Sequence, residues 1–211
     1  MGTLFQDIRY GFRMLLKNPG MTLVATLTLA LGIGANTTIF SALNGIMLRP
    51  LPVANADRLV VFGGQRQGGD PFADFSYPEF QDVRAQANAF SDVVAYSVNL
   101  AGLESGNRVE PVVLTYVSGN YFTALGLKPV QGRLIGGVET EKLGTEQVVV
   151  LGYGYWKRRF NADPNIVGQL VKLNGHSFTV VGVTPESFHG LFSLVDMQAY
   201  LPLGVRTLWQ Q

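Results

Sequence analysis

The sequence contains no cysteine and only two histidines. The missing cysteines exclude disulfides, thiol catalysis and cysteine metal sites, and such a composition is typical of, though not restricted to, bacterial envelope proteins. His176 and His189 have no second histidine and no acidic residue at metal-ligand spacing. We therefore expect both histidines to be exposed polar residues and predict no metal site.

Motifs that carry catalysis are also missing. No G-x-x-x-x-G-K-[ST] sequence is present, so any nucleotide hydrolysis must come from a partner. No G-x-S-x-G nucleophile elbow occurs. Gly152-Tyr153-Gly154 lacks the third glycine of a dinucleotide fingerprint and is more typical of a turn that enters a helix. We predict no catalytic residue, no cofactor and no enzymatic activity.

Charge of either sign is scarce. The formal net charge is +1, which gives no argument for a nucleic-acid partner. The run Lys157-Arg158-Arg159 could contact lipid headgroups or another protein, but a solvated helix face is the default interpretation.

One long stretch, Asn18 to Leu48, has no charged residue at all. A bilayer core of about 30 Å needs roughly 20 apolar residues in a helix. We therefore predict a single transmembrane helix over residues 21–48, ended by the prolines of Arg49-Pro50-Leu51-Pro52. A cleaved signal peptide is the competing interpretation, and the lack of a clear A-x-A site argues against it.

This predicted helix carries small residues at steps of four, which allow another backbone to approach closely. Asn36 would be costly against hydrocarbon, and a neighbouring helix could satisfy its amide. The alternative is that small residues are simply common in membrane helices. The predicted helix-packing residues are Thr26, Ala30, Gly34, Asn36 and Thr38.

Residues 1–20 have the apolar spacing of an amphipathic helix, which could lie in the membrane interface. Arg9, Arg13 and Lys17 against Asp7 give this segment a charge of +2. Basic flanks stay in the cytoplasm. We expect the N-terminus inside the cell and residues 53–211 outside the membrane.

The rest of the chain indicates the α+β class, a mixed α/β extracytoplasmic domain with two lobes. Asn174-Gly175 between the alternating runs 169–173 and 176–183 is the strongest hairpin signal. Ser118 is predicted to cap a short helix through Leu125, with Gly126 as its stop. We further expect a loop at 63–70, helices at 78–87 and 153–160, and strands at 58–62, 92–100, 109–117 and 147–151.

Several motifs together resemble one family. The segments Asp7-Ile8-Arg9-Tyr10, Lys17-Asn18-Pro19-Gly20 and Leu29 to Phe40 are similar to the first membrane segment of MacB/FtsX-type ABC transporter permeases. The similarity continues through Leu48 to Pro52, Ser76-Tyr77-Pro78, Val117 to Phe122, Leu125-Gly126, Val150-Leu151-Gly152, Trp156 to Phe160, Asp163-Pro164, Leu173-Asn174-Gly175 and Val180 to Val183.

This resemblance implies that residues 53–211 are a MacB-like periplasmic core domain on the bacterial inner membrane. In the family the permease usually dimerises, an ABC-type ATPase subunit sits on the cytoplasmic side, and three further membrane helices follow the periplasmic domain. The given chain reaches Gln211 without them, and its best later apolar run, Pro111–Leu127, is typical of strand, turn and helix.

Two functions therefore remain open. The first is a non-catalytic part of an ABC permease, truncated or partial, in which the helix and periplasmic domain couple a partner ATPase to export or to extracytoplasmic work. Its partners would be that ATPase, the bilayer, and further permease helices or a second permease copy. The second is a stand-alone membrane-anchored periplasmic binding or interaction module. The small-residue stripe favours the first.

Overall fold

The protein is described here from a computed structural model, which places residues 2–47, 51, 53, 55–63, 75–105, 108–136, 147–191 and 195–209. The chain divides into two compact units, Met1–Arg49 and Pro50–Gln211.

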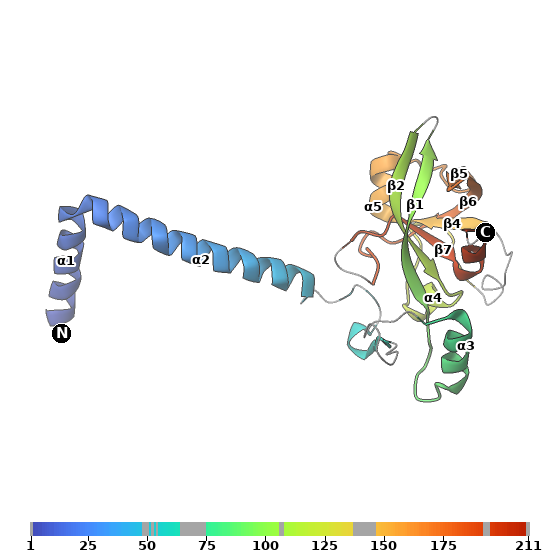
Figure 1. Cartoon of the computed structure of the whole chain (residues 1–211), viewed down its shortest axis with the longest axis horizontal. Coiled ribbons are helices and arrows are strands. Elements are labelled where there is room, and N and C mark those ends of the chain that lie inside the picture. The colour runs from blue at the N-terminus through green and yellow to red at the C-terminus, as the bar shows by residue number, and fades with distance from the viewer. Residues whose placement is uncertain are drawn as a thin grey trace. The chain divides into compact units, whose positions relative to one another are not determined.

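The first unit consists of two helices that meet at a corner (Figure 1). Helix α1 covers Gly2–Lys17 and helix α2 covers Pro19–Met47. The break falls on Asn18, where the following proline disfavours helical backbone. The Thr22 hydroxyl donates a hydrogen bond to the Leu15 carbonyl at 2.7 Å, and also lies 2.9 Å from the Asn18 carbonyl. This side chain in α2 therefore holds the end of α1 across the corner.

The second unit mixes helices and strands, which confirms the α+β class. Its helices and strands follow one another as η1 (Ala56–Arg58), α3 (Tyr77–Gln86), β1 (Tyr96–Ser105), β2 (Arg108–Val117), α4 (Tyr121–Ala124), β3 (Gln131–Gly132), β4 (Val148–Leu151), α5 (Tyr153–Arg159), β5 (Leu170–Leu173), β6 (His176–Val183), β7 (Ala199–Pro202) and η3 (Leu203–Trp209).

Six of the strands form a sheet that closes on itself. Strand β1 pairs antiparallel with β2, β2 runs parallel to β7, and β7 pairs antiparallel with β4. Strand β4 runs parallel to β6, which pairs antiparallel with β5, and β5 returns antiparallel to β1. Strand β3 adds to β6 outside the ring. The result is a small barrel, which leaves few unpaired strand edges.

The interior of the barrel is filled by side chains. Leu103, Leu114, Leu173, Phe178 and Leu201, each from a different strand, are at most 3% exposed and belong to one apolar cluster. A barrel of this size has room for side chains rather than for a channel. A second apolar cluster contains Tyr121 and Phe122 of α4, together with Phe188, Met197 and Tyr200. The domain is therefore a packed body with two neighbouring cores.

The predicted hairpin is confirmed. Asn174 and Gly175 have φ of 47° and 82°, the left-handed backbone that a two-residue turn of this kind requires. Lys172 pairs with Ser177 and Leu170 with Thr179 on either side of the turn. The alternating burial of β5 and β6 then places one face of the hairpin in the barrel interior.

Helix α3 also matches its prediction. Ser76 caps it by accepting a hydrogen bond from the Glu79 backbone N–H, and Glu79 accepts one from the Ser76 N–H in return. The strands predicted at 109–117 and 147–151, and the helix predicted at 153–160, agree with β2, β4 and α5 within a residue.

Other predictions were wrong. Residues 58–62 form no strand, because the described chain offers them no pairing partner, and Val60 and Val61 are 62% and 78% exposed. The strand predicted at 92–100 begins only at Tyr96. Of the loop predicted at 63–70, residues 64–70 lie outside the described residues.

Ser118 is not the cap of α4. Asn120 occupies that position, and the buried Ser118 hydroxyl instead accepts a hydrogen bond from the Ala95 N–H at 3.0 Å. The predicted stop is correct, because Gly126 has φ of 67° directly after the helix.

Candidate functional site

Helix α2 is the described element whose length and composition most clearly indicate where it lies. Among the described residues it alone is long and apolar enough, by length and composition, to cross a membrane, over Pro19–Ser41. No part of its most apolar window is buried within the structure. The predicted packing residues are exposed along it: Thr26, Ala30, Gly34, Asn36 and Thr38.

The geometry of α2 separates these residues into two sets. Each step of four residues advances by about 40° around a helix with 3.6 residues per turn. Thr26, Ala30, Gly34 and Thr38 therefore form one stripe, which winds through roughly 120°. Asn36 lies two residues from Gly34 and from Thr38, and residues two apart do not share a face. The amide and the stripe therefore lie on different sides of the helix.

The stripe is open and weakly polar. A Cβ placed on Gly34 would meet no atom within 4 Å, so another backbone has access to that position. The Thr38 hydroxyl donates to the Gly34 carbonyl at 2.8 Å, and Thr28 bonds to Val24 in the same way. These hydroxyls are satisfied inside the helix. Among the described residues neither the Asn36 side chain nor the Thr26 hydroxyl of the stripe has a hydrogen-bond partner, so these are polar groups that a neighbour could satisfy.

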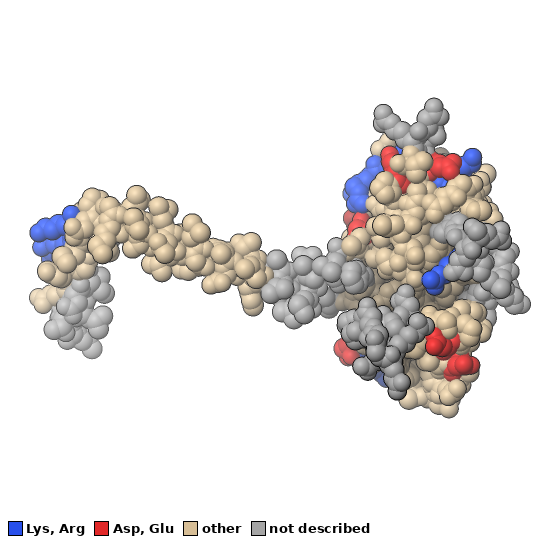
Figure 2. Space-filling view, viewed as in Figure 1, with Lys and Arg blue, Asp and Glu red and all other residues tan. Residues whose placement is uncertain are grey.

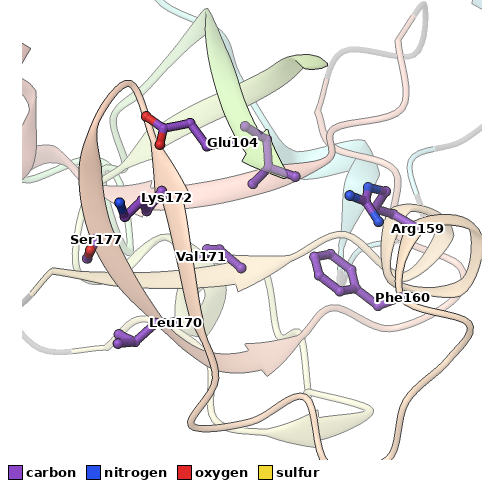
Figure 3. A pocket seen from close by; sticks show the side chains of 8 residues that line it. Glu104, Arg159, Phe160, Leu170, Val171, Lys172 and Ser177 are labelled. Atoms are coloured by element: carbon purple, nitrogen blue, oxygen red, sulfur yellow. The ribbon is translucent and has the colours of Figure 1, made fainter. Parts of the chain in front are cut away.

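The second unit contains a hollow of about 430 Å³ at the junction of β1, β5, β6 and α5 (Figure 3). Leu103 and Glu104 line it from β1, and Arg159 and Phe160 from the end of α5. The remaining lining residues come from the β5–β6 hairpin: Leu170, Val171, Lys172 and Ser177. In Figure 3 Val171 and Phe160 lie on opposite sides of the hollow, with Glu104 and Lys172 at its rim.

The hollow has no arrangement for catalysis among the residues that the structure describes. Ser177 is its only hydroxyl, and among the described residues it makes no hydrogen bond to Lys172, its partner across the hairpin, or to another base that could activate it. Arg159 is already engaged, because its Nε lies 3.1 Å from the Glu110 carboxylate and its guanidinium lies 5.7 Å from the Phe160 ring centre. The described residues also contain no cluster of three side chains able to hold a metal ion.

The basic run on α5 is occupied within the domain. Lys157 lies over the Tyr153 ring at 5.9 Å, Arg158 bonds to the Asp196 carboxylate at 3.3 Å, and Arg159 pairs with Glu110. These contacts account for the three charges without an external partner. Surface pairs of this kind contribute about 0–1 kcal/mol each.

His189 is exposed as predicted, whereas His176 is half-buried at the start of β6, so the prediction was wrong for His176. His189 also has an acidic partner that the sequence spacing did not indicate. Its Nδ1 lies 3.1 Å from Asp196 Oδ1, seven residues along the chain. The imidazole side chain is 62% exposed. Asp196 thus joins His189 to Arg158 of α5, an arrangement that positions a loop. Among the described residues no nucleophile contacts this histidine.

An exposed apolar face on the outside of the barrel was not predicted. Leu100 of β1 and Val109 of β2 are 73% and 67% exposed, and Val98 is 42% exposed. Figure 2 shows few charges on this side of the domain over β1 and β2. The alternation in residues 96–100 would place Leu100 inside. The register with β2 instead directs Ala101 and Leu103 inward, opposite Val112 and Glu110.

Comparison with known proteins gives the family. A family model described as MacB-like periplasmic core domain matches residues 22–211. Macrolide export ATP-binding/permease protein MacB of Chlorobium phaeobacteroides is 23% identical over 205 residues, which cover 90% of this chain and 31% of that protein. The protein of the same name from Hahella chejuensis is 28% identical over 191 residues, 89% of this chain and 27% of its own length. The chain thus spans less than a third of the length of these relatives.

One solved structure supports the fold. The extracellular domain of the ABC-type transporter YknZ from Gram-positive bacteria superposes with a TM-score of 0.52 at 16% identity, over 65% of this chain and 67% of that one. The periplasmic region of MacB from Actinobacillus actinomycetemcomitans is 25% identical with a TM-score of 0.48, over 62% and 58%. Because the family match runs from within α2 through the whole second unit, this chain belongs to the MacB-like periplasmic core domain family.

Proposed function

We propose that this chain is the membrane-anchored part of an ABC transporter permease, in which α2 and the extracytoplasmic domain relay motion from a partner ATPase. The observation that carries the proposal is the family match over residues 22–211, which includes both the apolar helix and the domain. The relatives' names, Macrolide export ATP-binding/permease protein, point to transport driven by ATP.

ATP hydrolysis is assigned to a cytoplasmic ABC-type ATPase partner, because the sequence has no phosphate-binding loop. The purified chain is expected to hydrolyse no ATP by itself. Residues 1–20 would lie on the cytoplasmic side, residues 21–48 within the inner membrane, and residues 53–211 outside. The basic flank at Arg9, Arg13 and Lys17 supports this orientation.

The domain would transmit force rather than conduct a substrate. Its barrel interior is filled by apolar side chains, so no passage runs through it. A closed, well-packed body moves as a unit, which suits a relay between a membrane helix and a partner outside the membrane. The stripe of Thr26, Ala30, Gly34 and Thr38 would pack against a further permease helix or a second permease copy, and Asn36 would meet a different neighbour.

Crosslinking in the membrane tests the proposal, since the chain has no native cysteine. Ala30→Cys lies on the stripe, and Ala35→Cys, five residues away, lies about 140° around the helix from Ala30 and about 100° from Asn36, so it serves as a matched control. We expect a short photoactivatable crosslinker attached to the cysteine to join Ala30→Cys, and not Ala35→Cys, to another membrane helix. Equal or absent crosslinking at both positions would instead favour the alternative of a stand-alone anchored module.

A further inference from the structure

The basic side of α1 is the described surface whose chemistry most clearly specifies a partner. Arg9, Arg13 and Lys17 follow one another at steps of four, so they lie within about 80° of the helix circumference. All three are exposed, and among the described residues none has an ion-pair partner. Figure 2 shows these positive charges gathered where α1 approaches the corner with α2.

The three basic residues lie next to a set of apolar positions on α1, which form the apolar phase of the helix. Positions 4, 5, 8, 12, 15 and 16 are apolar in the sequence and fall within about 120° of the circumference, beside the basic arc. Leu15 and Leu16, the described members, are 51% and 68% exposed.

The corner fixes where this surface would lie. Because α1 ends at Lys17 and Thr22 bonds to the Leu15 carbonyl, α1 cannot continue α2 as one straight helix. If α2 crosses the bilayer, α1 runs across its end, at the level of the headgroups (Figure 1). This step rests on the proposed spanning role of α2.

We propose that α1 binds the cytoplasmic membrane surface through anionic phospholipid headgroups, with Arg9, Arg13 and Lys17 contacting the phosphates and the apolar phase entering the boundary region. Positive charge on α1 complements the negative charge of such a surface. Neighbouring long side chains can extend toward the headgroups while their methylene stems cover apolar surface. The surface thereby selects anionic over zwitterionic lipid and sets the position at which α2 enters the membrane.

The full chain in lipid nanodiscs provides the test. Leu16→Cys carries an environment-sensitive fluorophore, and the neutral quencher acrylamide reports its exposure to water. Discs of phosphatidylcholine alone are compared with discs that also contain phosphatidylglycerol. We expect shielding of the label in the anionic discs and loss of that shielding in phosphatidylcholine. High salt should weaken it, since salt screens the attraction.

Charge removal assigns the effect to the three residues. Each basic residue near an anionic surface favours the membrane-bound state about five-fold. Arg13→Gln should therefore lower the ratio of bound to detached α1 about five-fold. The triple variant Arg9→Gln, Arg13→Gln, Lys17→Gln should respond equally to both lipids. The control variant, which removes the same charge from the outer domain, should behave as the wild type: Lys128→Gln, Lys157→Gln, Lys172→Gln.

Lipid-independent shielding, or shielding that survives in the triple variant, would overturn the inference. Shielding that appears only when an ABC-type ATPase is added would overturn it in favour of a protein partner. A second label at Leu27→Cys separates this result from the proposed function. If the label at Leu27→Cys is shielded but the label at Leu16→Cys is quenched, only the inference about α1 is wrong. If the label at Leu27→Cys is quenched as well, α2 does not span the membrane, and both the inference and the proposed function are wrong.

Discussion

Asn174 and Gly102, 72 residues apart, exchange two hydrogen bonds that join the β5–β6 hairpin to strand β1. The Gly102 N–H donates to Asn174 Oδ1 at 2.7 Å, and the Asn174 N–H donates to the Gly102 carbonyl at 2.9 Å. Only Leu103 with Leu173 and Glu104 with Lys172 pair further along this seam. The turn residue thus reinforces one of the two shortest pairings of the barrel, each of which has two residue pairs.

Asn174→Ala should lower the free energy of unfolding by about 2–4 kcal/mol, since it removes the acceptor of the Gly102 N–H and places alanine in left-handed backbone. Urea unfolding of residues 53–211, which we expect to fold alone, measures the change. Asn174→Asp keeps an acceptor oxygen and tolerates the backbone, so it should lose less than half as much. Equal losses in the two variants would show that this hydrogen bond does not stabilise the seam.

Ser118→Ala should cost about 1–3 kcal/mol in the same urea measurement. The Ser118 side chain is fully buried, accepts a bond from the Ala95 N–H, and donates to Asn120 Oδ1 at 2.8 Å. Alanine would leave the Ala95 donor unsatisfied. Ser177→Ala, on the surface of β6, serves as the control and should stay within about 0.5 kcal/mol of the wild type. A loss no larger than that of the control would contradict the role given to Ser118.

Stability should fall at high pH, in part through Tyr155. Burial, helped by the Glu110 carboxylate, raises the pKa of Tyr155 from 10.0 to about 12. Between these values the unfolded chain has lost this proton and the folded chain keeps it. The contribution is therefore fully present below pH 10 and declines as pH rises toward 12. By pH 11 the loss from this one group should be about 1 kcal/mol.

Tyr155→Phe should remove that part of the alkaline loss. Among the described residues the buried Tyr155 hydroxyl has no hydrogen-bond partner, so the substitution should leave stability at neutral pH unchanged or slightly raised. Urea unfolding at pH 8 and pH 11 gives the comparison. Tyr96→Phe, at a half-exposed ring, should follow the wild type. The account of Tyr155 fails if both variants lose the same stability between the two pH values.

Local signals in the sequence predicted local structure well. Asn174-Gly175 is a strong hairpin signal because few residue types adopt the left-handed backbone that the turn needs. Ser76 and Glu79 fix the start of α3 because each side chain caps the backbone N–H of the other. The apolar residues 58–62 gave a false strand, because a strand needs a partner and the sequence does not indicate where partners lie.

The closure of the barrel could not be predicted, since it depends on pairings between distant segments such as β2 with β7. The same holds for the contact between His189 and Asp196, which a loop brings together. On α2 the four-residue stripe was visible in the sequence. Helix geometry places Asn36 and Gly34 on different sides of α2. The sequence prediction, which grouped them as one packing set, did not make this distinction.

Topology can be measured with single cysteines. Gly2→Cys should react with an impermeant thiol reagent only after the membrane is opened, and Lys128→Cys in the domain should react in intact spheroplasts. The motivation is the basic flank before α2. The reverse pattern, with Gly2→Cys labelled and Lys128→Cys protected in intact spheroplasts, would mean that the domain lies in the cytoplasm.

The central claim is that α2 packs against another membrane helix, and Gly34→Leu tests it most directly. Gly34 and Gly32 are both open to added atoms in the structure, but they lie on different faces of the helix. The yield of the Ala30→Cys crosslink measures association along the stripe. It should fall by the equivalent of about 1 kcal/mol or more in Gly34→Leu and stay unchanged in Gly32→Leu, which changes the side of the helix that carries Asn36. An undiminished crosslink in Gly34→Leu, or equal losses in both variants, would contradict the packing face and with it the assignment to a permease.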